Sequence, residues 1–200
     1  MSLPLLLGFP VATAEAPAAY LSAPADQVEA FRTRFAAYPG LKVGLVWAGN
    51  NNHKDDRNRS IAAGHLLPLL EVKGCHFFSL QVGEKGADAA LLKSGVIDIS
   101  KEVSDITSTA AAIAALDLVI AVDTSLAHLA GALGTPVWTL LSYVPDWRWG
   151  LAGETTPLYR SMRLFRQPRR RDWPAVIAAV SDALKDIAGK KTGERDGKFS

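Results

Sequence analysis

The chain has 200 residues, of which 48% are hydrophobic and 21% are charged, and its formal net charge is +2. This length has room for one α/β domain with a substantial core, and the composition is ordinary for a globular protein. The small net charge does not indicate a nucleic-acid partner, and no apolar run is long enough for a transmembrane segment. The single cysteine, Cys75, excludes an intrachain disulfide framework or a cysteine-rich metal site.

Residues 1–40 are rich in Ala and Pro and contain one predicted helix at residues 25–37. Phe31, Phe35 and Tyr38 recur at helical spacing, which gives this helix one apolar face. We interpret the segment as a connector with one helix that packs on the main domain. The apolar start lacks a preceding positive charge and is interrupted by prolines, so we expect no signal peptide and a cytoplasmic protein.

From residue 41 the pattern alternates between β-type apolar runs and helical stretches. Strands are predicted at residues 41–48, 75–82, 96–100, 118–122, 136–141 and 162–165, and helices at residues 62–72, 87–93, 106–116, 124–133 and 173–187. This alternation predicts an α/β fold, a Rossmann-like, mostly parallel sheet with helices on both faces. We assign this domain to residues 41–188 and interpret the charged segment 189–200 as a disordered tail. Ligands of such sheets bind beyond the carboxyl ends of the strands.

The best candidate site is the turn after the strand predicted at residues 118–122. Asp123 or Thr124 can cap the next helix, and the free amides and dipole of a helix start attract an anion. Thr124 and Ser125 add hydroxyl groups, and His128 lies one turn further along the same face. A diphosphate would meet all of these groups together. The residues alone leave open the alternative of a simple helix cap beside a partly buried histidine.

Residues 119–136, VIAVDTSLAHLAGALGTP, resemble the donor-binding motif of the heptosyltransferase-like glycosyltransferase family 9. Similar proteins also carry, in the same order, segments like VGLVWAGN at 43–50, DRNRS at 56–60 and PDWRW at 145–149. The closest resemblance is to the domains that follow tetratricopeptide repeats in bacterial proteins.

This resemblance implies one half of a GT-B fold, in which two Rossmann-like domains surround a cleft. It implies that Asp123, Thr124, Ser125 and His128 hold the diphosphate of a nucleotide sugar. The acceptor and the catalytic base would come from an N-terminal domain of the parent protein. We therefore predict the donor-binding domain of a glycosyltransferase, inactive without its acceptor domain, with a nucleoside-diphosphate sugar as substrate and no cofactor.

The polar loop at residues 50–60 follows the first predicted strand and could neutralise a diphosphate. The candidates in this loop are Asn50, Lys54, Arg57 and Arg59. The resemblance implies a basic residue of this loop on the phosphates, and position favours Arg59, which with His128 would stabilise the leaving group. The alternative is a solvated loop with internal Asp–Arg pairs. Its histidine and aspartates find no clear further ligands, so we expect no metal.

Three further candidates follow other strands. Gln81 could meet a base or ribose, or its amide could bind the backbone instead. Asp146 and Trp147 could form a wall of the donor cleft or belong to a packed loop, whereas we expect Trp149 to be buried. The basic run at residues 166–171 is interpreted as a solvated charged face.

Two other functions stay open at this point. One is a nucleotide-sugar epimerase of the same two-domain architecture, and the other is a non-catalytic nucleotide-binding or interaction module of a repeat protein. A dinucleotide-dependent oxidoreductase is disfavoured, because asparagines rather than a glycine-rich fingerprint follow Gly49.

Overall fold

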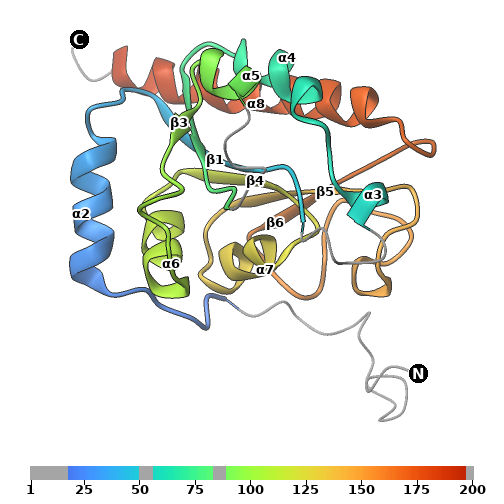
Figure 1. Cartoon of the computed structure of the whole chain (residues 1–200), viewed down its shortest axis with the longest axis horizontal. Coiled ribbons are helices and arrows are strands. Elements are labelled where there is room, and N and C mark those ends of the chain that lie inside the picture. Colours follow the sequence, from blue (N-terminus) through green and yellow to red (C-terminus); the bar gives the residue numbers. More distant parts are fainter. Residues whose placement is uncertain (1–17, 50–55, 83–88, 197–200) are drawn as a thin grey trace.

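The computed structural model describes residues 18–49, 56–82 and 89–196 (Figure 1). The strands are β1 (Leu41–Val46), β2 (Cys75–Ser79), β3 (Ile97–Asp98), β4 (Leu118–Val122), β5 (Val137–Leu141) and β6 (Met162–Arg166). The α-helices are α2 (Ala25–Phe35), α3 (Asp56–Arg59), α4 (Leu67–Leu70), α5 (Ala89–Lys93), α6 (Ile106–Ala114), α7 (Ser125–Ala132) and α8 (Trp173–Asp196). Short 3₁₀ helices lie at η2 (Ala63–Leu66) and η4 (Trp147–Trp149).

The described strands form one sheet in the order β3-β2-β1-β4-β5-β6, and all neighbouring strands pair in parallel. From β1 the chain adds β2 and β3 on one side, and from β4 it adds β5 and β6 on the other side. The direction in which strands are added therefore reverses between β1 and β4. Ligands of doubly wound sheets bind beyond the carboxyl ends of the strands at such a reversal. The prediction of a Rossmann-like, mostly parallel sheet is confirmed, and the loops after β1 and β4 lie at its reversal point.

Helices cover both faces of the sheet (Figure 1). Leu118, Ile120 and Val122 of β4 belong to the core beneath α4 and α8, whereas Val119 and Ala121 belong to the core beneath α6 and α7. A central strand that is buried on both faces must be apolar at every position, which explains the sequence of β4.

Helix α2 is packed into the second of these cores. Phe35 is almost fully buried, and its ring centroid lies 4.3 Å from that of Phe78 in β2. Before α2, the backbone N–H groups of Tyr20 and Leu21 both donate to the carbonyl oxygen of Ala132 at the end of α7. The segment before β1 is therefore attached to the domain at two places.

Three elements differ from the predictions. The helix predicted at residues 62–72 is a 3₁₀ turn followed by a single α-helical turn, with Pro68 in the first turn of α4, where the missing N–H of proline costs least. Residues 56–59 of the polar loop form the short helix α3. Helix α8 continues to Asp196, beyond its predicted end at residue 187. None of the described helices combines the length and apolar character needed to cross a membrane.

Candidate functional site

The Asp123 turn, residues 122–128, lies where the strand order reverses. Thr124 is the N-cap residue of α7 with an extended backbone, but its side chain makes no capping hydrogen bond. Its hydroxyl oxygen is buried and has no partner within the described residues. The predicted side-chain cap is thus not formed, because the Thr124 hydroxyl does not turn back to the helix amides. The start of α7 is left as a set of N–H donors that suits an anion.

Arg59 connects the loop after β1 to the Asp123 turn. Its Nη1 donates to the carbonyl oxygen of Asp123 at 3.1 Å, and its Nε lies 3.6 Å from Oδ1 of Asp56. The guanidinium packs over Gly49, where a Cβ atom would lie 2.5 Å from Nη2 of Arg59. The structure therefore brings Arg59 across the reversal point to the predicted turn.

His128 lies in an aromatic enclosure formed with Trp149 and Tyr159. Its Nδ1 is 2.9 Å from the Tyr159 hydroxyl, and its ring stacks on the Trp149 indole with 4.9 Å between centroids. Its Nε2 is 3.9 Å from Oδ1 of Asp123. Burial lowers the pKa of His128, and the Asp123 carboxylate opposes that shift only in part. The imidazole is consequently held in its neutral form near pH 7.

The Tyr159 hydroxyl also stays protonated, because burial and a hydrogen bond with Tyr20 raise the pKa of Tyr159. It can donate to Nδ1 of His128 or accept from it, according to the tautomer of the imidazole, and donation would place the imidazole proton on Nε2, on the side of Asp123. In that tautomer the imidazole would present an N–H donor beside the start of α7.

The enclosure depends on residues that no sequence motif marks. Arg166, at the end of β6, donates to backbone carbonyls within residues 149–153 and holds the loop that carries Trp149. The Tyr159 ring fills the space above Gly131, where a Cβ atom would come within 2.5 Å of that ring. Tyr159 lies outside any regular element, so no periodic spacing predicts its contact with His128.

Other predicted site residues lie elsewhere. Asn50 and Lys54 fall outside the described residues, and Arg57 is an exposed residue of α3. Gln81 is 6% exposed, its Oε1 accepts from the backbone N–H of Ala48 at 2.9 Å, and its Nε2 lies 3.5 Å from the carbonyl oxygen of Val82. Its amide is bound by the backbone and is not presented to a nucleoside.

Asp146 and Trp147 belong to the loop that carries the enclosure. Asp146 caps η4 by accepting from the backbone N–H of Arg148, and its carboxylate pairs with the Arg148 guanidinium at 3.2 Å. The same guanidinium lies 5.8 Å from the centroid of Trp147, which is 56% exposed. Trp149 is buried, as predicted. Among the described residues, no group of three or more His, Cys, Asp or Glu side chains could hold a metal ion.

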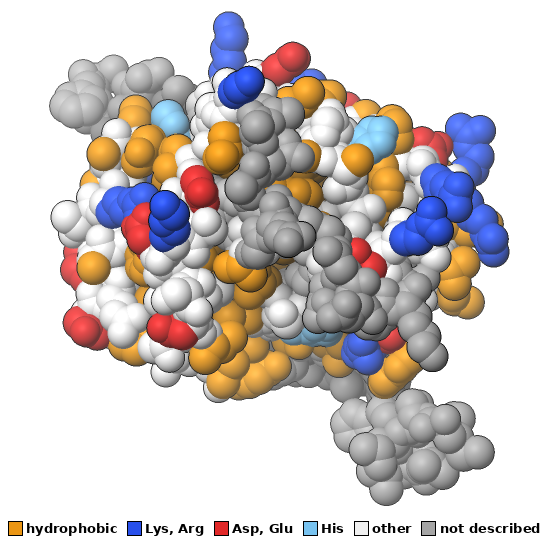
Figure 2. All heavy atoms as spheres, viewed as in Figure 1, with side chains coloured by type: hydrophobic (Ala, Val, Ile, Leu, Met, Phe, Trp, Pro, Cys, Tyr) orange, Lys and Arg blue, Asp and Glu red, His pale blue; other side chains and the backbone are white. Residues whose placement is uncertain are grey.

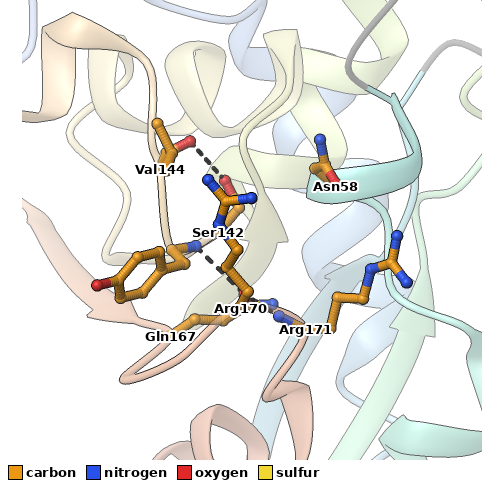
Figure 3. A pocket seen from close by; sticks show the side chains of 7 residues that line it. Asn58, Ser142, Val144, Gln167, Arg170 and Arg171 are labelled. Carbon is orange, nitrogen blue, oxygen red and sulfur yellow. Dashed lines mark hydrogen bonds between the residues drawn. The ribbon is translucent and has the colours of Figure 1, made fainter.

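A cleft of about 570 Å³ opens at the same edge of the sheet (Figure 3). We call it the arginine cleft, and it is lined by Asn58, Ser142, Tyr143, Val144, Gln167, Arg170 and Arg171. These residues come from α3, from the loop after β5 and from the turn between β6 and α8. Lys and Arg side chains gather at the right-hand edge of Figure 2, where Figure 1 places that turn.

The basic run at residues 166–171 is therefore not one solvated face. Arg166 binds loop carbonyls, and Arg169 extends into solvent and pairs with Asp172 at 3.4 Å. Arg170 and Arg171 line the cleft. The interpretation as a solvated face holds for Arg169, Arg170 and Arg171, which are all exposed, but not for Arg166, whose guanidinium binds loop carbonyls.

Comparison with known proteins gives matches in both sequence and fold. Residues 104–172 match glycosyltransferase family 9 (heptosyltransferase). Protein FlbA of Caulobacter vibrioides is 34% identical over 160 residues, which cover 75% of this chain and 26% of FlbA. The chain thus spans about a quarter of this curated relative.

Two solved structures show the same fold. The E. coli ADP-heptose lps heptosyltransferase II matches with a TM-score of 0.61 and 15% identity, covering 86% of this chain and 54% of that one. The E. coli heptosyltransferase WaaC with ADP matches with a TM-score of 0.54 and 18% identity, covering 82% and 48%. The chain spans about half of each. The match to the model of glycosyltransferase family 9 (heptosyltransferase) covers residues 104–172 and so includes the Asp123 turn, and the solved heptosyltransferases share the fold.

Proposed function

We propose that this chain binds a nucleoside-diphosphate sugar and forms the donor half of a glycosyltransferase. The observation that carries the proposal is the meeting of Arg59, His128 and the uncapped start of α7 at the reversal point of the sheet. A guanidinium, an imidazole N–H and free amides together match the oxygens of a diphosphate. The WaaC structures contain ADP or ADP-2-deoxy-2-fluoro heptose, which supports a nucleotide ligand here as well.

In the proposed reaction, an acceptor hydroxyl oxygen attacks the anomeric carbon of the sugar while the bond from that carbon to the diphosphate oxygen breaks. The bonding electron pair leaves with the diphosphate, and the acceptor proton passes to a base of the acceptor domain. The role of this chain is to stabilise the negative charge that develops on the leaving group. Arg59 supplies a fixed positive charge, and neutral His128 supplies a hydrogen bond from Nε2.

We further propose that the chain binds its donor without turnover. We propose that the whole protein also contains an acceptor domain, which binds the acceptor and supplies the base. Tetratricopeptide repeats of the parent protein are part of the same proposal. The donor half alone would therefore hold a leaving group that has nothing to receive the sugar.

Calorimetric titration with ADP and with UDP tests this function. We expect saturable binding of at least one of them, with affinity about tenfold lower in His128→Ala, which corresponds to the loss of one hydrogen bond to a charged group. Arg57→Gln, which changes an exposed cation on the neighbouring helix, should bind as the unaltered chain does. Absence of saturable binding to either nucleotide would favour an interaction module, and sugar transfer by the chain alone would refute the proposed lack of turnover.

A further inference from the structure

We propose that the arginine cleft is a second binding site, which takes the phosphate or carboxylate group of a small molecule. It is separate from the Asp123 turn, since α3 directs Arg59 to that turn and Asn58 to the cleft. Figure 3 shows Arg170 and Arg171 extending from the β6–α8 turn on one side and Asn58 lying on the other.

The guanidinium groups of Arg170 and Arg171 carry the positive charge of the cleft. Neither the Arg170 nor the Arg171 guanidinium forms an ion pair or hydrogen bond within the described residues, whereas their neighbour Arg169 is paired with Asp172. Arg170 and Arg171 bring two positive charges to the lining of one cleft, and these charges would attract an oxyanion bound there. Guanidinium groups match phosphate and carboxylate oxygens with paired N–H donors, which favours this class of ligand over a neutral one.

The cleft is also held in a fixed shape. Gln167 is 5% exposed, and its Oε1 accepts from the backbone N–H groups of Tyr143 at 3.2 Å and Arg171 at 3.0 Å. These contacts clamp the loop after β5 to the turn after β6. They hold Arg171 at a φ of 63°, in the left-handed region that residues other than glycine rarely occupy. Such conformations persist where the surrounding structure imposes them, and they cluster at ligand sites.

A buried donor points to the same ligand class. Both oxygen contacts of Gln167 fix the orientation of its amide, so that Nε2 is its free end. This Nε2 is buried and has no partner within the described residues. A buried N–H group without an acceptor is unusual and calls for a partner. A ligand oxygen in the cleft that Gln167 lines would supply one.

The size and lining of the cleft indicate more than an inorganic ion. A volume of about 570 Å³ is in the range of small-molecule sites. Tyr143 and Val144 add exposed apolar surface at 51% and 60% exposure. The ligand should therefore carry its acidic group on a body that packs against these side chains. This inference rests on the proposed function. If the chain binds a nucleotide sugar, the phosphate or carboxylate group belongs either to the sugar of the donor or to a separate acidic acceptor.

The first experiment is titration of the full chain with inorganic phosphate at constant ionic strength, followed by the NMR signals of the Tyr143 and Arg171 amides. The test variant is Arg170→Gln combined with Arg171→Asn, because asparagine tolerates a positive φ. The control is Arg169→Gln in the same turn. We expect saturable binding to the unaltered chain and to the control, with affinity about tenfold lower in the double variant. Equal binding by all three, or no saturable binding, would overturn the proposal.

The second experiment separates the two sources of the acidic group. Preference for UDP-glucuronic acid over UDP-glucose, lost in the double variant, would assign the group to the donor sugar. Binding of free glucose 6-phosphate to the ADP-saturated chain, lost in the double variant, would assign it to a separate acceptor. If neither of these two results is obtained, the proposal for a small-molecule ligand is overturned. Failure of the proposed donor site would instead appear as loss of ADP binding, with phosphate binding at Arg171 unchanged.

Discussion

The Asp123 turn and the arginine cleft share one edge of the sheet but are built in opposite ways. The turn comes from consecutive residues at one strand–helix junction, and its His128 ring is packed against aromatic rings and hydrogen-bonded to Tyr159. The cleft is assembled from three separate segments and presents two arginines whose guanidinium groups have no partner within the described residues. Substitutions in the turn should therefore affect stability and binding together, whereas substitution of the exposed arginines of the cleft should affect binding alone.

Alanine substitution of the two tryptophans of η4 should produce the greatest difference in stability. Trp149→Ala empties a buried space against His128 and should lower the free energy of unfolding by about 3–5 kcal/mol. Trp147→Ala removes an exposed ring and should change it by no more than about 0.5 kcal/mol. Urea unfolding curves of both variants measure the difference. Equal losses of stability in the two variants would show that Trp149, which packs on His128, does not contribute to the core.

The next effect concerns the arginines of α3. Arg59→Gln removes a charged hydrogen bond to the Asp123 carbonyl, and we expect a loss of about 1.5–3 kcal/mol in stability. Affinity for a nucleoside diphosphate should fall about tenfold as well. Arg57→Gln, on the exposed side of the same helix, should change neither quantity. Unfolding and calorimetry on the same preparations test both; a stable but non-binding Arg59→Gln would indicate a contact with ligand only.

A smaller effect is expected from removing the Tyr159 hydroxyl. Tyr159→Phe keeps the packing over Gly131 but deletes the 2.9 Å hydrogen bond to Nδ1 of His128, so stability should fall by about 0.5–1.5 kcal/mol. Tyr143→Phe, which changes a half-exposed tyrosine of the cleft, is the matched control and should be neutral. Thermal unfolding measures the pair. An unchanged Tyr159→Phe would mean that this hydroxyl does not orient the imidazole.

The smallest expected effect is a dependence of stability on pH. The pKa of His128 is lowered by burial from its ordinary value of 6.5, so on acidification the unfolded chain gains this proton before the folded chain does. Stability from this residue is therefore complete well above pH 6.5 and decreases as the pH falls below it. His128→Gln should lack this component. Melting temperatures of both proteins between pH 8 and about pH 5 test the difference, and parallel curves would contradict it.

The sequence was sufficient for the fold because β-type apolar runs alternate with helical stretches, and the central strand Leu118–Val122 is apolar on both faces. The Asp123 turn and Arg59 were predicted together because both follow strands whose carboxyl ends meet in a parallel sheet; the structure places them in contact, and their role in binding stays a prediction. For Gln81 the sequence left two possibilities open, and in the structure its amide is bound by the backbone N–H of Ala48, just after β1. The sequence did not indicate that Arg170 lines a cleft or that Tyr159 contacts His128, because only the tertiary fold decides such contacts.

The contact between Tyr20 and Tyr159 bears on where this domain can be cut for expression. Their rings stack with 6.4 Å between centroids, and Tyr159 in turn holds His128. A shortened protein that begins at residue 41 would lose this stacking, uncover Phe78 and leave the Ala132 carbonyl without its two donors. A boundary at residue 18 keeps all three, and we therefore propose that the smallest useful fragment includes the helix before β1.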